Sequence, residues 1–130
     1  MTEENQLRVL VVDDSAVIRE LIAVNLELEG FLVVAASDGE AALRAVREFE
    51  PNVITLDVMM PRLDGIETAR RLRSDPETEH VPIVMVTGRS SPADLERGRD
   101  VGVEAYLMKP FEPSELVEVI RRLAVNGRAG

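Results

Sequence analysis

The chain has 130 residues, enough for one domain that buries a core without disulfides, and it contains no cysteine. Its net charge of −9 disfavours direct binding to nucleic acid or to an anionic membrane, because such binding needs clustered lysines and arginines. The N-terminal residues lack the regions of a signal peptide, and no apolar run approaches the roughly 20 residues of a membrane-spanning helix. We therefore expect a cytoplasmic protein.

Five short segments rich in apolar and β-branched residues are predicted to be strands. They are Leu7–Val12, Phe31–Ala36, Val53–Leu56, Pro82–Val86 and Ala105–Met108. The third of them, Val53–Leu56, runs without polar alternation, which is typical of a strand buried on both faces of a parallel sheet.

Helices are predicted between and after these strands. They begin near Ser15, Asp38, Asp64, Ser91 and Glu112, and the first, second and fourth end near Gly30, Pro51 and Gly102. In the first helix the residues at helical spacing are Val17, Ile18, Leu21, Ile22, Asn25 and Leu28. The alternation predicts one α/β domain, a doubly wound parallel sheet with helices on both faces. We assign residues 1–126 to this domain and residues 127–130 to a flexible tail or the start of a linker.

Polar side chains follow four of the predicted strands. Asp13 and Asp14 come after the first, Asp57 after the third, Thr87 after the fourth and Lys109 after the fifth. Because ligands of open α/β sheets bind at the carboxyl ends of the strands, these side chains are expected to converge on one site.

The charges of these side chains point to a cation and a phosphate. Carboxylates about 5 Å apart repel by about 3 kcal/mol per pair at an effective dielectric of about 20, so a cation is expected among the aspartates. A carboxylate-rich site suits Mg²⁺ or Mn²⁺, and Lys109 supplies a second positive charge. A carboxylate in these surroundings can accept a phosphoryl group. Each part also has an ordinary structural explanation: a helix cap, a strand threonine or a solvated lysine.

Four stretches in the same order resemble the receiver domain of bacterial two-component response regulators, the family that includes the chemotaxis regulator CheY. The stretches are residues 9–15, 57–65, 84–88 and 106–111, and the resemblance covers nearly the whole chain. It implies a flavodoxin-like sheet of five parallel strands in the order 2-1-3-4-5, with five helices. Two stretches depart from the family pattern: Gly88 follows Thr87, and Val103-Glu104-Ala105 precedes Tyr106.

The resemblance also implies roles for the acidic residues. Asp57 resembles the phosphoacceptor, and Asp14 and Asp57 look like direct Mg²⁺ ligands together with the Met59 backbone carbonyl. Asp13 looks like a ligand through water, and Mn²⁺ can substitute for Mg²⁺. Lys109 is similar to the phosphate-binding lysine of the family.

Thr87 and Tyr106 are similar to the family's switch pair. The resemblance therefore implies a module that receives a phosphoryl group from a sensor histidine kinase or a phosphotransfer protein. Phosphorylation would alter a surface made by the fourth helix, fifth strand and fifth helix. This surface would contact a downstream output protein or domain, or would form a phosphorylation-dependent homodimer. Such a module is not an enzyme with a separate substrate, although it catalyses its own phosphorylation and dephosphorylation at Asp57.

The lifetime of the phosphorylated state is expected to depend on the residues two positions after Asp57 and after Thr87. These are Met59 and Arg89, and the family resemblance indicates the same two positions. Met59 cannot polarise a water, and Arg89 is long enough to lie across the phosphate. Both are expected to slow hydrolysis.

Other functions fit the sequence less well. A pseudo-receiver would keep the fold as an interaction module without phosphorylation, but the complete acidic set argues against it. A haloacid-dehalogenase-type phosphatase places an acid two residues after its nucleophile, where this chain has Met59. A flavodoxin-like cofactor binder needs a phosphate-cradling first loop, which Asp13 and Asp14 would repel. Glycine motifs of Rossmann and P-loop proteins are missing from the sequence.

Overall fold

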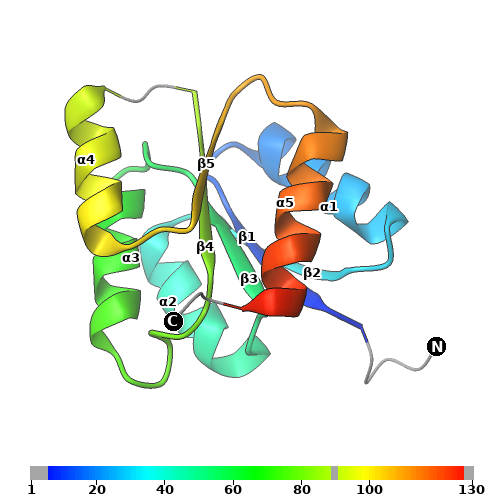
Figure 1. Ribbon diagram of the computed structural model, residues 1–130, viewed down its shortest axis with the longest axis horizontal. Coiled ribbons are helices and arrows are strands. Elements are labelled where there is room, and N and C mark those ends of the chain that lie inside the picture. Colours follow the sequence, from blue (N-terminus) through cyan, green and yellow to red (C-terminus); the bar gives the residue numbers. More distant parts are fainter. Residues whose placement is uncertain (1–5, 89–90, 128–130) are drawn as a thin grey trace.

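The computed structural model describes residues 6–88 and 91–127, which form a three-layer α/β domain (Figure 1). The strands are β1 Arg8–Val12, β2 Leu32–Ala36, β3 Val53–Leu56, β4 Ile83–Thr87 and β5 Ala105–Met108. The helices are α1 Ala16–Leu28, α2 Gly39–Phe49, α3 Gly65–Ser74, α4 Pro92–Val101 and α5 Pro113–Asn126. All strand pairs are parallel, in the order β2-β1-β3-β4-β5, which confirms the predicted fold.

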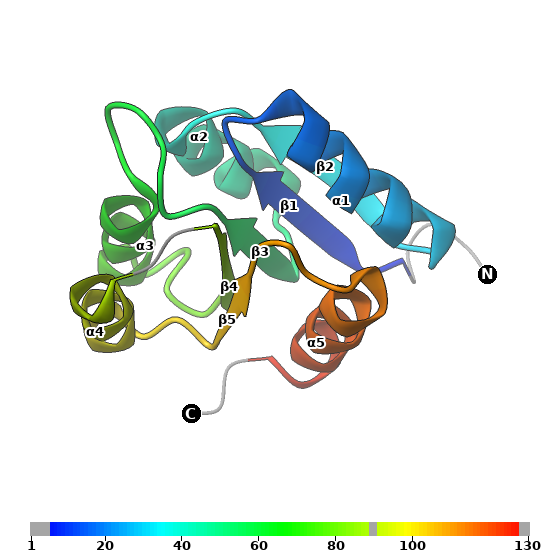
Figure 2. The same cartoon turned by 90° about the horizontal axis from the view of Figure 1, so that it is seen from above.

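Helices cover both faces of the sheet. Seen from above, α1 and α5 lie on one side of the strands, and α2, α3 and α4 lie on the other (Figure 2). Alternate residues along each strand therefore enter two separate cores, because successive side chains of a strand point to opposite faces. In β1, for example, Val9 and Val11 belong to the core under α1 and α5, whereas Leu10 and Val12 belong to the core under α2 and α3.

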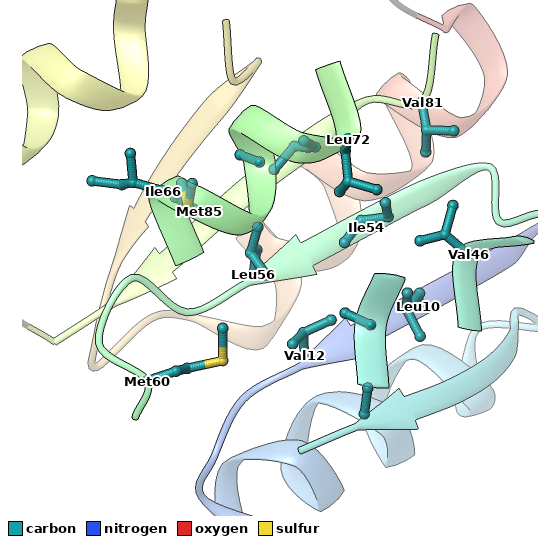
Figure 3. Packing of buried hydrophobic residues seen from close by; sticks show 14 of the residues in the cluster. Leu10, Val12, Val46, Ile54, Leu56, Met60, Ile66, Leu72, Val81 and Met85 are labelled. Atoms are coloured by element: carbon teal, nitrogen blue, oxygen red, sulfur yellow. The ribbon is translucent and has the colours of Figure 1, made fainter. Parts of the chain in front are cut away.

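The core under α2 and α3 is aliphatic apart from two methionine side chains. Ile54 and Leu56 of β3 lie at its centre and contact residues from the helices that flank them (Figure 3). Its buried members include Leu10, Val12, Val46, Ile54, Leu56, Met60, Ile66, Leu72, Val81, Ile83 and Met85. Burial of this apolar surface fixes the central strand whose end carries Asp57.

Side-chain caps fix the start of four helices where the sequence predicted them. Ser15, Asp38, Asp64 and Ser91 each accept a hydrogen bond from a backbone N–H in the first turn of the helix that follows. Ser91 also forms a reciprocal capping box with Asp94. Glu112 at the start of α5 makes no such bond.

The apolar residues of α1 form two stripes on different faces of the helix. Ile22 and Leu26 are buried against the sheet, with Ile18 beside them. A second stripe faces outward, and its members Val17, Leu21, Val24 and Leu28 are 75%, 44%, 45% and 79% exposed. Spacing alone did not separate them, because both stripes repeat every three or four residues.

Within the described part of the chain, no helix is both long and apolar enough to cross a membrane.

A buried threonine in β3 offers a test of how the core is packed. Among the described residues, Thr55 Oγ1 finds no hydrogen-bond partner although the residue is 1% exposed. Because valine has nearly the same shape and no hydroxyl to desolvate, Thr55→Val is expected to stabilise the domain by about 1 kcal/mol in urea unfolding.

The same substitution at Thr78 is the matched control. Its hydroxyl is also buried but donates to the Leu72 carbonyl at 2.7 Å. Thr78→Val should therefore destabilise the domain by about 1 kcal/mol. Equal effects of the two substitutions would contradict this view of the core.

Candidate functional site

The carboxyl ends of β1, β3 and β5 bring the predicted acidic residues and the lysine together. Carboxylate oxygens of Asp13, Asp14 and Asp57 all lie within 4.8 Å of one another. The Lys109 ammonium Nζ is 2.7 Å from Asp13 Oδ2 and 3.6 Å from Asp57 Oδ2. Residues separated by as many as 96 positions thus form one charged cluster at a single edge of the sheet.

Asp57 is held by the end of β3. Its backbone N–H donates to the Val12 carbonyl of β1 at 3.0 Å, and its Oδ1 accepts a hydrogen bond from the Met59 N–H at 3.2 Å. The residue is only 5% exposed. One carboxylate oxygen is therefore oriented by the backbone, while the other faces Lys109.

Asp13 is more deeply buried than Asp57, at 1% exposed. Its Oδ1 accepts a hydrogen bond from the Ser15 N–H at 2.9 Å, and its backbone N–H donates to the Ala36 carbonyl of β2. The Arg19 guanidinium donates to the Asp13 carbonyl at 2.8 Å. Asp14, by contrast, is exposed, so the pair presents one fixed carboxylate and one that faces solvent.

Burial and neighbouring charges perturb Asp57. The pKa of its carboxyl is raised from 3.8 to about 6, chiefly by burial, then by the negative charge of Asp13, with a smaller contribution from Asp14. Lys109 and the N–H of Met59 act in the opposite direction. The charged form of Asp57 is therefore costly here, and any added cation would favour it.

The donor set fits a hard divalent cation. Three clustered carboxylates supply only oxygen atoms, the ligands that Mg²⁺ and Mn²⁺ prefer. The single ammonium of Lys109 cannot neutralise three carboxylates. Two of the three are buried, so solvent screens their repulsion poorly.

A cleft opens beside the acidic cluster. Its volume is about 510 Å³, and its lining includes Asp14, Met59, Asp64, Asp94 and Arg97. Asp94 and Arg97 come from α4, and nothing in their local sequence marked them as neighbours of the site. Met59 is 54% exposed.

Gly65 begins α3 and also lies very close to the backbone of Asp57. A Cβ at this residue would lie 2.1 Å from the carbonyl oxygen of Asp57, far inside van der Waals contact. Only glycine therefore allows α3 to begin this close to the end of β3. The Asp64-Gly65 pair indicated a helix start in the sequence, but not this approach.

Thr87 and Tyr106 lie on the same face of the sheet, on adjacent strands. Tyr106 is in register with Met85, two residues before Thr87 along β4. The Thr87 residue is fully buried, whereas Tyr106 is partly exposed and its hydroxyl donates to the Asp94 carbonyl of α4 at 3.2 Å. Burial raises the pKa of the Tyr106 phenol. Arg89, the other predicted rate-setting residue, lies outside the described residues.

This combination of fold and acidic edge defines a class of protein, the CheY-like receiver domains. Chemotaxis protein CheY4 of Vibrio cholerae superimposes with a TM-score of 0.85 and 35% identity, over 90% of this chain and 98% of that one. The receiver domain of the Pseudomonas aeruginosa sensor histidine kinase PA1611 gives a TM-score of 0.85 at 29% identity, covering 93% and 99%. That structure has a magnesium ion coordinated in its active-site cleft.

Comparison of sequences shows which family the chain belongs to. The family model described as response regulator receiver domain matches residues 9–121, and the chain belongs to this family. DNA-binding response regulator MtrA of Mycolicibacterium paratuberculosis is 44% identical over 114 residues, which are 88% of this chain and 49% of that protein. The chain thus spans about half the length of the curated relatives it matches.

Proposed function

We propose that the domain accepts a phosphoryl group on Asp57 from a histidine kinase or a phosphotransfer protein and changes an output surface in response. The observation that carries this proposal is the contact of Lys109 with both Asp13 and Asp57 inside a buried acidic cluster. A lone carboxylate in a loop needs no such partner. Here the ammonium is positioned to offset charge on whatever oxygen atoms approach Asp57.

The chemistry assigned to the chain is a phosphoryl transfer. An Asp57 carboxylate oxygen forms the bond to phosphorus as the bond from phosphorus to the donor nitrogen breaks, which gives an acyl phosphate. Lys109 would then bind a phosphoryl oxygen, while the Met59 N–H keeps the other carboxylate oxygen in place. Asp13, Asp14 and Asp57 would hold Mg²⁺ with the Met59 carbonyl, Asp13 acting through water, and Mg²⁺ would neutralise charge on the transferring group.

Two alternatives have less support. A pseudo-receiver would not need the three aspartates and the lysine to meet, yet they form one cluster. A phosphatase acting through an aspartyl phosphate would need an acid two residues after Asp57, where Met59 stands. We therefore propose a signalling module that catalyses its own phosphorylation and dephosphorylation.

Thr87 and Tyr106 would transmit the change. The Thr87 hydroxyl would be drawn toward the acyl phosphate, which would make room for Tyr106 to move and shift the population of two arrangements of α4, β5 and α5. This surface would contact an output protein, an output domain or a second copy of the chain. MtrA carries the name of a DNA-binding response regulator, but with a net charge of −9 we propose no direct DNA contact for this chain.

The phosphoacceptor assignment makes a direct prediction. Incubation with acetyl phosphate and Mg²⁺ should add one phosphoryl group to the protein. Mg²⁺ should be required, because a cation is needed to offset the repulsion between the acidic cluster and the incoming dianion. Asp57→Asn and chelation by EDTA should each abolish the modification in intact-mass analysis.

Asp100→Asn is the matched control, since Asp100 is an exposed aspartate of α4 and should leave the modification unchanged. Full modification of Asp57→Asn, or indifference to EDTA, would overturn the assignment.

A second prediction concerns the lifetime of the acyl phosphate. Met59 is exposed beside Asp57 and offers no group that can orient an attacking water. Met59→Asn, alone or with Arg89→Ala, is expected to shorten the half-life several-fold, a barrier change of about 1 kcal/mol. Phosphate release measured after removal of the donor gives the half-life.

Leu28→Asn places the same residue at an exposed position far from the acidic cluster and should leave the half-life unchanged. An equal or longer half-life in Met59→Asn would show that this side chain does not restrict the water.

A further inference from the structure

The phenol of Tyr106 occupies a notch in α4 that exists only because residue 98 is glycine. A Cβ at Gly98 would lie 1.7 Å from the Tyr106 hydroxyl oxygen and 2.7 Å from its Cζ, so both cannot be present in this arrangement. Gly98 is buried in the interior of α4, Pro92–Val101. Glycine is among the least favourable residues at such a position, so its presence there calls for a specific reason.

The notch is completed by a hydrogen bond. The Tyr106 hydroxyl donates to the carbonyl of Asp94, one turn before Gly98 on the same helix. The ring also packs against the core under α2 and α3. Tyr106 thus ties β5 to α4 by shape at Gly98 and by a polar contact at Asp94.

We propose that Gly98 is a positioning residue for the switch. It lets the Tyr106 phenol pack directly against α4, so that a movement of Tyr106 also moves the helix. The inference rests on the proposed function, since phosphorylation at Asp57 would drive the movement. Any side chain at position 98 would displace the phenol and disconnect α4 from Thr87, while the acidic cluster would keep its contacts.

The chain is suited to a direct test, because Tyr106 is its single tyrosine and it has no tryptophan. Tyrosine emission therefore reports on Tyr106 alone. Gly98→Ala should increase the quenching of this emission by acrylamide in the unphosphorylated protein. It should also remove the change in emission that beryllofluoride, a mimic of the acyl phosphate, produces in the wild type.

A double-mutant cycle distinguishes loss of the packing between Tyr106 and Gly98 from a general destabilisation of α4. In a Tyr106→Leu background the long phenol is gone, so Gly98→Ala should raise the midpoint of thermal unfolding, as expected from helix propensity. In the wild-type background the same change should lower it. Gly88→Ala is the control for a glycine replacement outside α4, because among the described residues a Cβ there meets only Lys109 Cβ and Cδ, both at 3.8 Å.

The outcomes distinguish this inference from the phosphoacceptor assignment. Loss of the beryllofluoride response in Gly98→Ala, with acetyl phosphate still modifying Asp57 to the wild-type extent, supports the proposal that Gly98 positions Tyr106 on α4. Unchanged acrylamide quenching, or the same shift in unfolding midpoint in both backgrounds, overturns it. A wild-type protein that is not modified at Asp57 contradicts the proposed function instead, while the quenching and the cycle still decide whether Gly98 seats Tyr106.

Discussion

The ammonium of Lys109 lies between two buried carboxylates, 2.7 Å from Asp13 and 3.6 Å from Asp57. Without it, two negative charges with little exposure to water would face each other at the end of the sheet, with Asp14 close by. The lysine reduces this repulsion but does not remove it, because three carboxylates exceed one ammonium. A site with this excess of negative charge favours a divalent cation and, once the cation is bound, a phosphoryl group.

The fold supplies this arrangement through the parallel sheet. Adjacent strands end at the same edge, and the backbone N–H of Lys109 donates to the Thr87 carbonyl at 2.8 Å, which extends the pairing of β4 and β5 to the lysine itself. On the other side, Gly65 lets α3 approach the carbonyl of Asp57. The partly buried Arg73–Glu104 ion pair, at 2.7 Å, joins α3 to the segment before β5 and so helps to fix β5 and the lysine that follows it.

Much of this could be predicted from local sequence. Apolar runs predicted the strands to within a residue or two, and capping residues predicted the starts of four helices. The strand ends predicted that three aspartates and Lys109 would meet. The features that were missed depend on contacts between distant segments. The exposed stripe of α1, the approach of Gly65 to Asp57 and the notch at Gly98 each involve a packing partner that local spacing does not reveal. Glycine within a helix is a usable signal, since it costs helix propensity and so implies a close neighbour.

The charge balance of the cluster can be measured most directly by following the Asp57 carboxyl carbon by NMR during a pH titration. In the metal-free protein we expect a pKa of about 6, above the ordinary 3.8, because burial and Asp13 disfavour the charged form. Since Lys109 opposes this shift, Lys109→Met should raise the pKa further, and Mg²⁺ should lower it in both proteins. Titration of Asp57 near pH 4 in both proteins, with no response to Mg²⁺, would show that the cluster holds no such excess of negative charge.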